Sequence, residues 1–93
     1  MREEVKKFAE EMEKVLVKND FKGGWSECNI KTLYRCFETE TKELKELIEV
    51  KLIDQIDEYN SVQNYIEEIQ DKIIDMVNYC MMIHERLNTK IFV

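Results

Sequence analysis

Apolar residues recur at helical spacing from the start of the chain to about Asn19, with charged residues between them. The apolar positions are Val5, Phe8, Met12, Val15 and Leu16. This pattern predicts a first helix that ends in the polar stretch 18–20. The segment 21–28 holds both glycines of the chain beside Trp25, and we expect it to form a structured loop.

A second apolar seam begins after Asn29, a residue type that often caps helices. It predicts a helix that ends near Val50 and carries the charged residue Glu40 at a seam position. The seam consists of Ile30, Leu33, Phe37, Leu44, Leu47 and Ile48. A short helical stretch is expected over 52–59.

Asn60 and Ser61 are the expected caps of a long last helix that runs to about Leu87. Its apolar positions are Val62, Tyr65, Ile66, Ile69, Ile73, Met76, Val77, Cys80 and Ile83. Proline is absent and residues of high helix propensity dominate the chain. We therefore predict one all-α domain over 1–93, a helical bundle with two long core helices and an N-terminal helix.

A chain of 93 residues is too short to cover long apolar helix faces alone, so we expect a homodimer or homotetramer. The net charge of -6 argues against binding of a nucleic-acid polymer, because no basic stripe is present. The same charge would repel a free nucleoside triphosphate unless a divalent cation inverted the local field. No apolar run is long enough to span a bilayer, so no membrane partner is expected.

The cysteines Cys28, Cys36 and Cys80 form neither a CxxC pair nor an even disulfide set. With no secretory leader in the charged start of the chain, these cysteines indicate a reducing, cytoplasmic setting. Cys80 is expected to be a packed thiol within the apolar stripe. His84 is the only histidine, and without a second imidazole or paired cysteines a zinc site is not expected.

Carboxylates at helical spacing are the candidate chemistry. Glu40 and Glu43 project from one helix face, and Asp75 lies in an otherwise apolar turn of the last helix. If the last helix packs against the second, these oxygens would form a site for a hard divalent metal. The alternative is that both clusters are solvated helix faces, with Asp75 paired to Lys72 or Tyr79, on a plain helical interaction protein.

Three runs resemble the MazG-like, all-α nucleotide pyrophosphohydrolases: KGGW at 22–25, ETKELKE at 40–46 and DMVNYCMMI at 75–83. In that family, helical ExxE and ExxD motifs bind magnesium, and a nucleoside triphosphate is split into monophosphate and pyrophosphate. The resemblance implies Mg2+, or Mn2+, held by Glu40, Glu43 and Asp75. It also implies a carboxylate that accepts the proton of the attacking water, from Glu43 or Glu46.

Candidate substrate contacts are of two kinds. Trp25, Asn78 and Tyr79 would contact the sugar or base, while Lys22 would meet phosphate oxygens. Arg35 could meet phosphate oxygens as well. Simpler interpretations are a loop anchor for Trp25 and solvated surface cations for Lys22 and Arg35.

One departure from the family pattern concerns Lys72, which stands where the ExxD motif has its first acid. Lys72 either weakens the metal site or meets a substrate phosphate directly. A second register takes Glu68 and Asp71 as the motif, but it breaks the match to the apolar run that follows. The sequence thus leaves three hypotheses. The first is a magnesium-dependent pyrophosphohydrolase, and the second is a noncatalytic relative that serves as a helical oligomerisation or regulatory binding module. The third is the plain helical interaction protein described above.

Overall fold

The computed structural model describes residues 1–19, 25, 28–53, 63 and 65–89 of the chain. The described part contains the α-helices α1 (Glu3–Asn19), α2 (Ile30–Leu47) and α4 (Ile66–Thr89), and a π-helix η2 (Ile48–Ile53). Among these residues there is no strand, so the all-α prediction is confirmed for them. None of the described helices is long and apolar enough to cross a membrane.

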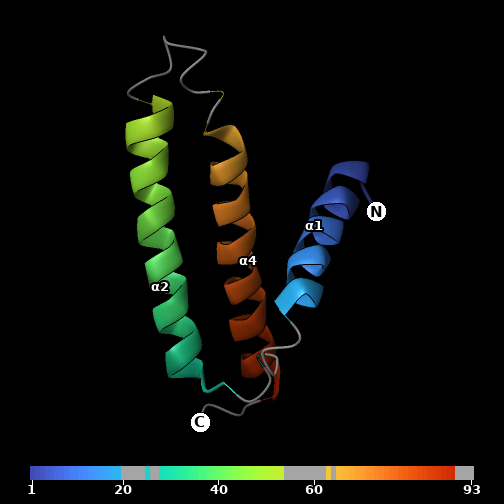
Figure 1. Ribbon diagram of the computed structural model, residues 1–93. Helices are drawn as coiled ribbons and strands as arrows, with labels where there is room; N and C mark the ends of the chain where they lie inside the picture. The colour runs from blue at the N-terminus through green and yellow to red at the C-terminus, as the bar shows by residue number, and fades with distance from the viewer. Residues whose placement is uncertain (20–24, 26–27, 54–62, 64, 90–93) are drawn as a thin grey trace.

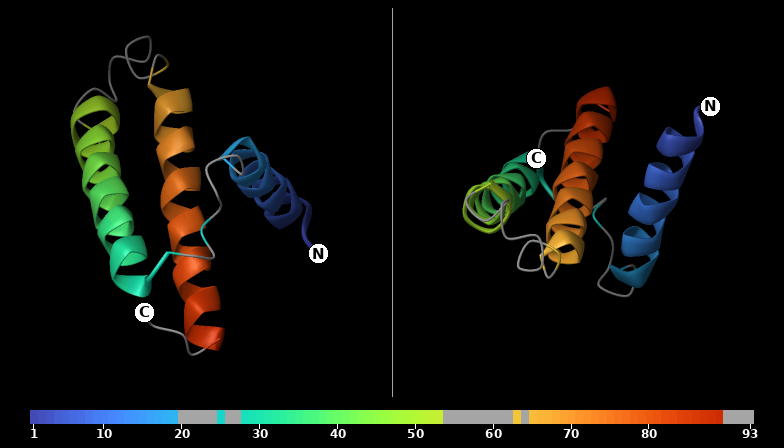
Figure 2. Two further views of the ribbon diagram at one scale, coloured as in Figure 1. Left: turned by 60° about the horizontal axis from the view of Figure 1, so that its bottom comes forward. Right: turned by 90° about the horizontal axis from the view of Figure 1, so that it is seen from above.

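Helix α4 lies between the other two α-helices (Figures 1 and 2). It runs beside α2 in the opposite direction, and α1 leans against its other side. The expectation that the last helix packs on the second is therefore confirmed. Among the residues that the structure describes, the buried apolar core consists of Leu33, Leu44, Ile69, Ile74 and Met82, all from α2 and α4.

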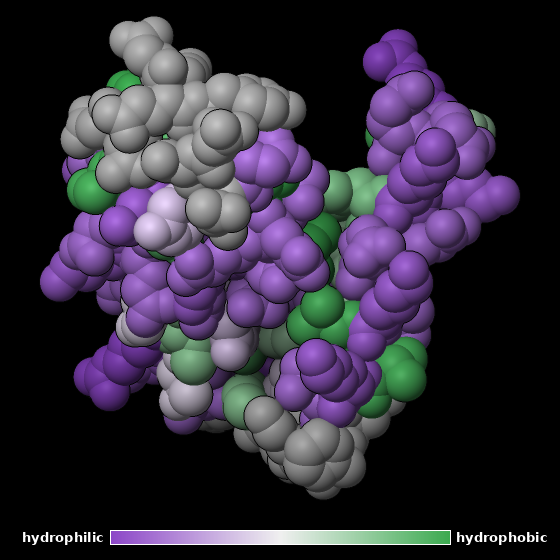
Figure 3. All heavy atoms as spheres, turned by 45° about the horizontal axis from the view of Figure 1, so that its top comes forward, coloured by the Kyte–Doolittle hydropathy of each residue, from purple (hydrophilic) through white to green (hydrophobic). Residues whose placement is uncertain are grey.

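Helix α1 buries none of its residues. Its apolar residues Val5 and Phe8 are 53% and 38% exposed, while Val15 and Leu16 near its end are half-buried. Only the last turns of α1 therefore contribute to packing. Hydrophobic surface gathers in the cleft between the projecting α1 and the rest of the molecule (Figure 3).

The start of α2 is capped as the sequence predicts. The side chain of Asn29 accepts a hydrogen bond of 2.8 Å from the backbone N–H of Thr32, which satisfies one of the free donors of the first turn. Arg86 of α4 donates to the carbonyl of Cys28 from Nε at 3.0 Å and from Nη2 at 2.7 Å. These bonds fix the approach to α2 on the C-terminal part of α4.

Two predicted boundaries differ from the structure. The helical path does not break near Val50, because the N–H of Ile48 bonds to carbonyls of the preceding turn and the chain continues as η2 to Ile53. Helix α4 begins at Ile66, later than expected, with the carbonyl of Tyr65 accepting from the N–H of Ile69. The rest of the short stretch over 52–59 and the caps at 60 and 61 lie outside the described residues.

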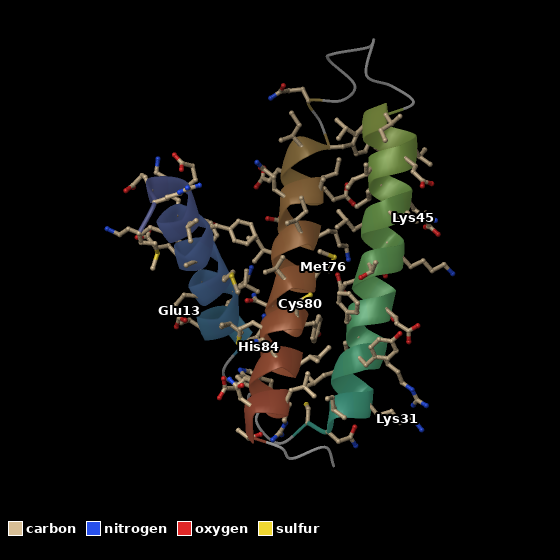
Figure 4. All side chains as sticks on the ribbon, turned by 180° about the vertical axis from the view of Figure 1, so that it is seen from behind. Glu13, Lys31, Lys45, Met76, Cys80 and His84 are labelled. Atoms are coloured by element: carbon tan, nitrogen blue, oxygen red, sulfur yellow. The ribbon has the colours of Figure 1, made fainter. Side chains whose placement is uncertain are left out.

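The rotation of α4 also differs from the predicted stripe. Cys80 is exposed, so the prediction of a packed thiol is wrong, whereas Ile74 and Asn78 are buried. Met76, Cys80 and His84 follow one another along α4 in Figure 4. Apolar residues occur almost all around this helix, and the two flanking helices rather than the spacing decide which of them are covered.

Candidate functional site

A cavity of about 420 Å³, the main cavity, lies where the end of α1, the start of α2 and the middle of α4 meet. Its apolar and aromatic walls come from Val15, Leu16, Trp25, Leu33, Tyr79 and Met82. Its polar and thiol groups come from Asn19, Cys28, Thr32, Cys36, Glu40, Asp75 and Asn78. An apolar hollow with a few converging polar groups is the usual form of a small-molecule site.

Helical spacing explains why these side chains converge. On α2, Leu33, Cys36 and Glu40 lie on one stripe, and on α4, Asp75, Asn78 and Met82 do the same. Sequence analysis missed Thr32, Cys28 and Cys36 as cavity residues. The sequence did contain a signal for Cys36, because this residue lies one turn before Glu40 on the same face of the helix.

Four charged side chains on the facing helices α2 and α4 form what we call the charged cluster: Glu40, Glu43, Lys72 and Asp75. The ammonium of Lys72 lies 3.3 Å from Oε2 of Glu40 and also donates to Oε2 of Glu43. These bonds raise the pKa of Lys72, the one to Glu43 most. Lys72 is therefore a bridging cation on the two carboxylates that the sequence marked as metal ligands.

Asp75 belongs to the same cluster without an ion pair of its own among the residues that the structure describes. Burial raises the pKa of its carboxyl, and the nearby carboxylate of Glu40 raises it further; the ammonium of Lys72 opposes both. Three carboxylates face one ammonium, so the cluster keeps an excess of negative charge at one end of the main cavity.

Asn78 is the most buried polar residue of the described chain, at 3% exposure. Its Nδ2 donates to the carbonyl of Met12 at 3.3 Å and so links α4 to α1, while its Oδ1 has no hydrogen-bond partner. A buried acceptor without a partner costs stability, unless a ligand supplies the donor. The Asn78 amide is thus half satisfied, at the wall of a cavity.

Tyr79 of α4 and Cys36 of α2 both line the main cavity, where their side chains are neighbours. Burial raises the pKa of Tyr79 to about 12, and the neighbouring Cys36 side chain adds to this shift through its electrostatic interaction and hydrogen bond with the phenol. The phenol therefore stays protonated at neutral pH and can act there only as a hydrogen-bonding group. Trp25 reaches the same cavity, and its carbonyl accepts a 3.0 Å bond from the N–H of Cys28.

The other predicted site residues that the structure describes do not line the main cavity. Glu43, Glu46, Glu68 and Lys72 line a second, more open hollow of about 520 Å³ beside η2. Lys22 lies outside the described residues.

The acids of the second register, Glu68 and Asp71, are both exposed on α4, and Arg35 is exposed on α2. His84 is also exposed. None of these positions lines the main cavity, and only Glu68 among them lines the second hollow.

The resemblance implies a magnesium ion at the charged cluster. Carboxylate oxygens suit Mg2+ chemically, but it requires near-ideal octahedral geometry at short distances. Within the described ranges, no group of three or more acidic, cysteine or histidine side chains is arranged to hold a metal. The ammonium of Lys72 already contacts both Glu40 and Glu43, so the residues as arranged do not fit the ion.

Comparison with known proteins adds no relative: no family model, no curated protein and no solved structure matches this chain.

Proposed function

We propose that this chain is a noncatalytic binding module of MazG-like type, whose main cavity takes a nucleoside-like ligand. The observation that carries the proposal is the buried Asn78 amide, whose Oδ1 has no hydrogen-bond partner, on a residue that lines the main cavity together with Trp25 and Tyr79. A planar heterocycle offers an aromatic face to the rings and an N–H donor to the amide. Cavities of roughly 300–1,000 Å³ commonly hold molecules of this size.

Charge selects among such ligands. The excess of negative charge at Glu40 and Asp75 disfavours phosphates in the cavity when no divalent cation is present. A neutral nucleoside should therefore bind more tightly than its monophosphate, and the triphosphate should bind least. This order is opposite to that of a site built to grip phosphates.

The test uses Trp25, the only tryptophan, as an intrinsic probe. Titration of the four common nucleosides and their phosphates, without magnesium, should quench its fluorescence in a saturable way for at least one nucleoside. Asn78→Leu should abolish the response, and Asn88→Leu, the same change at an exposed position of α4, should preserve it. No saturable response, or an unchanged one in Asn78→Leu, would contradict the proposal.

A second candidate is the magnesium-dependent pyrophosphohydrolase. Glu40, Glu43 and Asp75 converge on one cluster from two helices, but a metal ion could bind there only after Lys72 had left both glutamates. Glu43 or Glu46 would then accept a water proton. Pyrophosphate release across a panel of nucleoside triphosphates with Mg2+ or Mn2+, compared with Glu43→Gln, tests this function directly; absence of release supports the binding module.

Self-association is part of the proposal. Val5 and Phe8 of α1 remain exposed, and Val17 is 58% exposed on the same helix. A homodimer or homotetramer through this helix would cover apolar surface that the single chain leaves in water. Sedimentation at micromolar concentration tests it, and a monodisperse monomer would contradict it. A reducing cytoplasmic setting is also part of the proposal, and the uneven number and the spacing of the cysteines in the sequence support it.

A further inference from the structure

The charged cluster contains its own cation. Glu40 and Glu43 lie one turn apart on α2, and Lys72 and Asp75 lie one turn apart on the facing α4. Lys72 bridges the two glutamates, with Nζ 3.3 Å from Glu40 and in direct contact with Glu43. The lysine thereby joins α2 to α4 at the point where three carboxylates would otherwise repel one another.

We propose that the ammonium of Lys72 substitutes for a divalent metal ion, so that the cluster is assembled without metal and wild-type protein responds to Mg2+ only as to any salt. A cation attached to the chain needs no association from solution, so the cluster is neutralised in part at every metal concentration. A metal ion would first have to displace both contacts of Lys72.

The same arrangement explains the state of Asp75. One ammonium carries half the charge of a divalent ion, and it is engaged by Glu40 and Glu43. Asp75 is therefore the carboxylate of the cluster that Lys72 does not pair with, and its carboxyl is partly buried beside Glu40. The cluster therefore joins the two helices through Lys72 and leaves the carboxylate of Asp75 without an ion pair among the described residues. This inference does not depend on whether the main cavity binds a nucleoside.

The inference predicts that removal of the lysine charge creates a metal site. Lys72→Gln leaves three carboxylates without their cation, so the variant should be less stable than wild type in metal-free buffer. Mg2+ or Mn2+ should restore the stability of Lys72→Gln in a saturable way, with an affinity at least about ten-fold tighter than that of wild type. We expect a factor of this modest size because the ion pairs of Lys72 are partly exposed and therefore oppose metal binding only weakly.

Two measurements test this. Melting is followed with MgCl2 against NaCl of equal ionic strength, and Mn2+ binding is measured directly by electron paramagnetic resonance. Lys14→Gln is the matched control, because Lys14 makes an exposed pair with Glu11 on α1 and its loss should leave the metal response unchanged. Lys72→Arg keeps the positive charge and should remain as unresponsive to metal as wild type.

Wild-type protein that binds Mn2+ as tightly as Lys72→Gln would overturn the inference, as would Lys72→Gln that gains no binding. If Lys72→Gln does not fold without metal, refolding in MgCl2 but not in NaCl supports the inference, and failure in both contradicts it. Neither measurement uses nucleotide, so its outcome is separate from that of the tryptophan titration.

Discussion

Replacement of Asn78 by leucine should separate stability from binding. Leucine has nearly the shape of asparagine but no polar atoms, and Asn78 is 3% exposed. The change removes the 3.3 Å bond to the Met12 carbonyl, which contributes about 0.5–1.5 kcal/mol. It also removes the buried Oδ1 without a partner, whose desolvation costs about 1–3 kcal/mol.

The second effect outweighs or equals the first, so Asn78→Leu should leave the free energy of unfolding unchanged or raise it by up to about 2 kcal/mol. For a domain of this size each kcal/mol shifts the melting temperature by about 4–8 °C. Denaturation in urea gives the free energy, and the tryptophan titration described above gives the binding. Asn88→Leu should change neither quantity appreciably, because position 88 is exposed.

A loss of more than about 1 kcal/mol in Asn78→Leu would refute this reasoning. Such a loss would mean that the bond between Asn78 and Met12 supports the α1–α4 contact strongly, and that the free end of the amide costs little. The buried asparagine would then be a structural link, and its place at the cavity wall would say nothing about a ligand.

Three further changes test other groups. Thr41→Val removes a buried hydroxyl without a partner and should raise the free energy of unfolding in urea by about 1 kcal/mol; a decrease would show that the hydroxyl is satisfied. Asp75→Asn should stabilise the protein by up to about 1 kcal/mol at pH 7 but not near pH 3. The reason is that a carboxyl whose folded-state pKa is raised costs stability only once the pH exceeds its unfolded-state pKa, and equal gains at both pH values would contradict this assignment. Arg86→Met removes bonds to the Cys28 carbonyl and should lower the melting temperature, by an amount equivalent to about 1–3 kcal/mol, and an unchanged value would argue against this link.

Much of the fold follows from local pattern. Asn29 caps α2 because its side chain matches the free N–H groups of the first turn, and that chemistry is visible in the sequence. Glu40 in an apolar seam and Asp75 in an apolar turn must both lie near a helix contact, so their approach could be expected. The boundary near Val50 could not, because the π-helical continuation to Ile53 leaves no mark in the apolar spacing.

The site itself depends on two facts that spacing does not determine. The first is the rotation of α4: with apolar residues around most of the helix, only the positions of α1 and α2 decide that Asn78 is buried while Cys80 is exposed. The second is the direction of a long side chain. Lys72 can extend into solvent or across to α2, and the choice depends on carboxylates more than twenty-five residues away along the chain. The identity of residue 72 as a lysine does not by itself decide between these two directions. Its contacts with Glu40 and Glu43 show that the ammonium is held by both carboxylates, so Lys72→Gln removes the cation that joins α2 to α4 at this point.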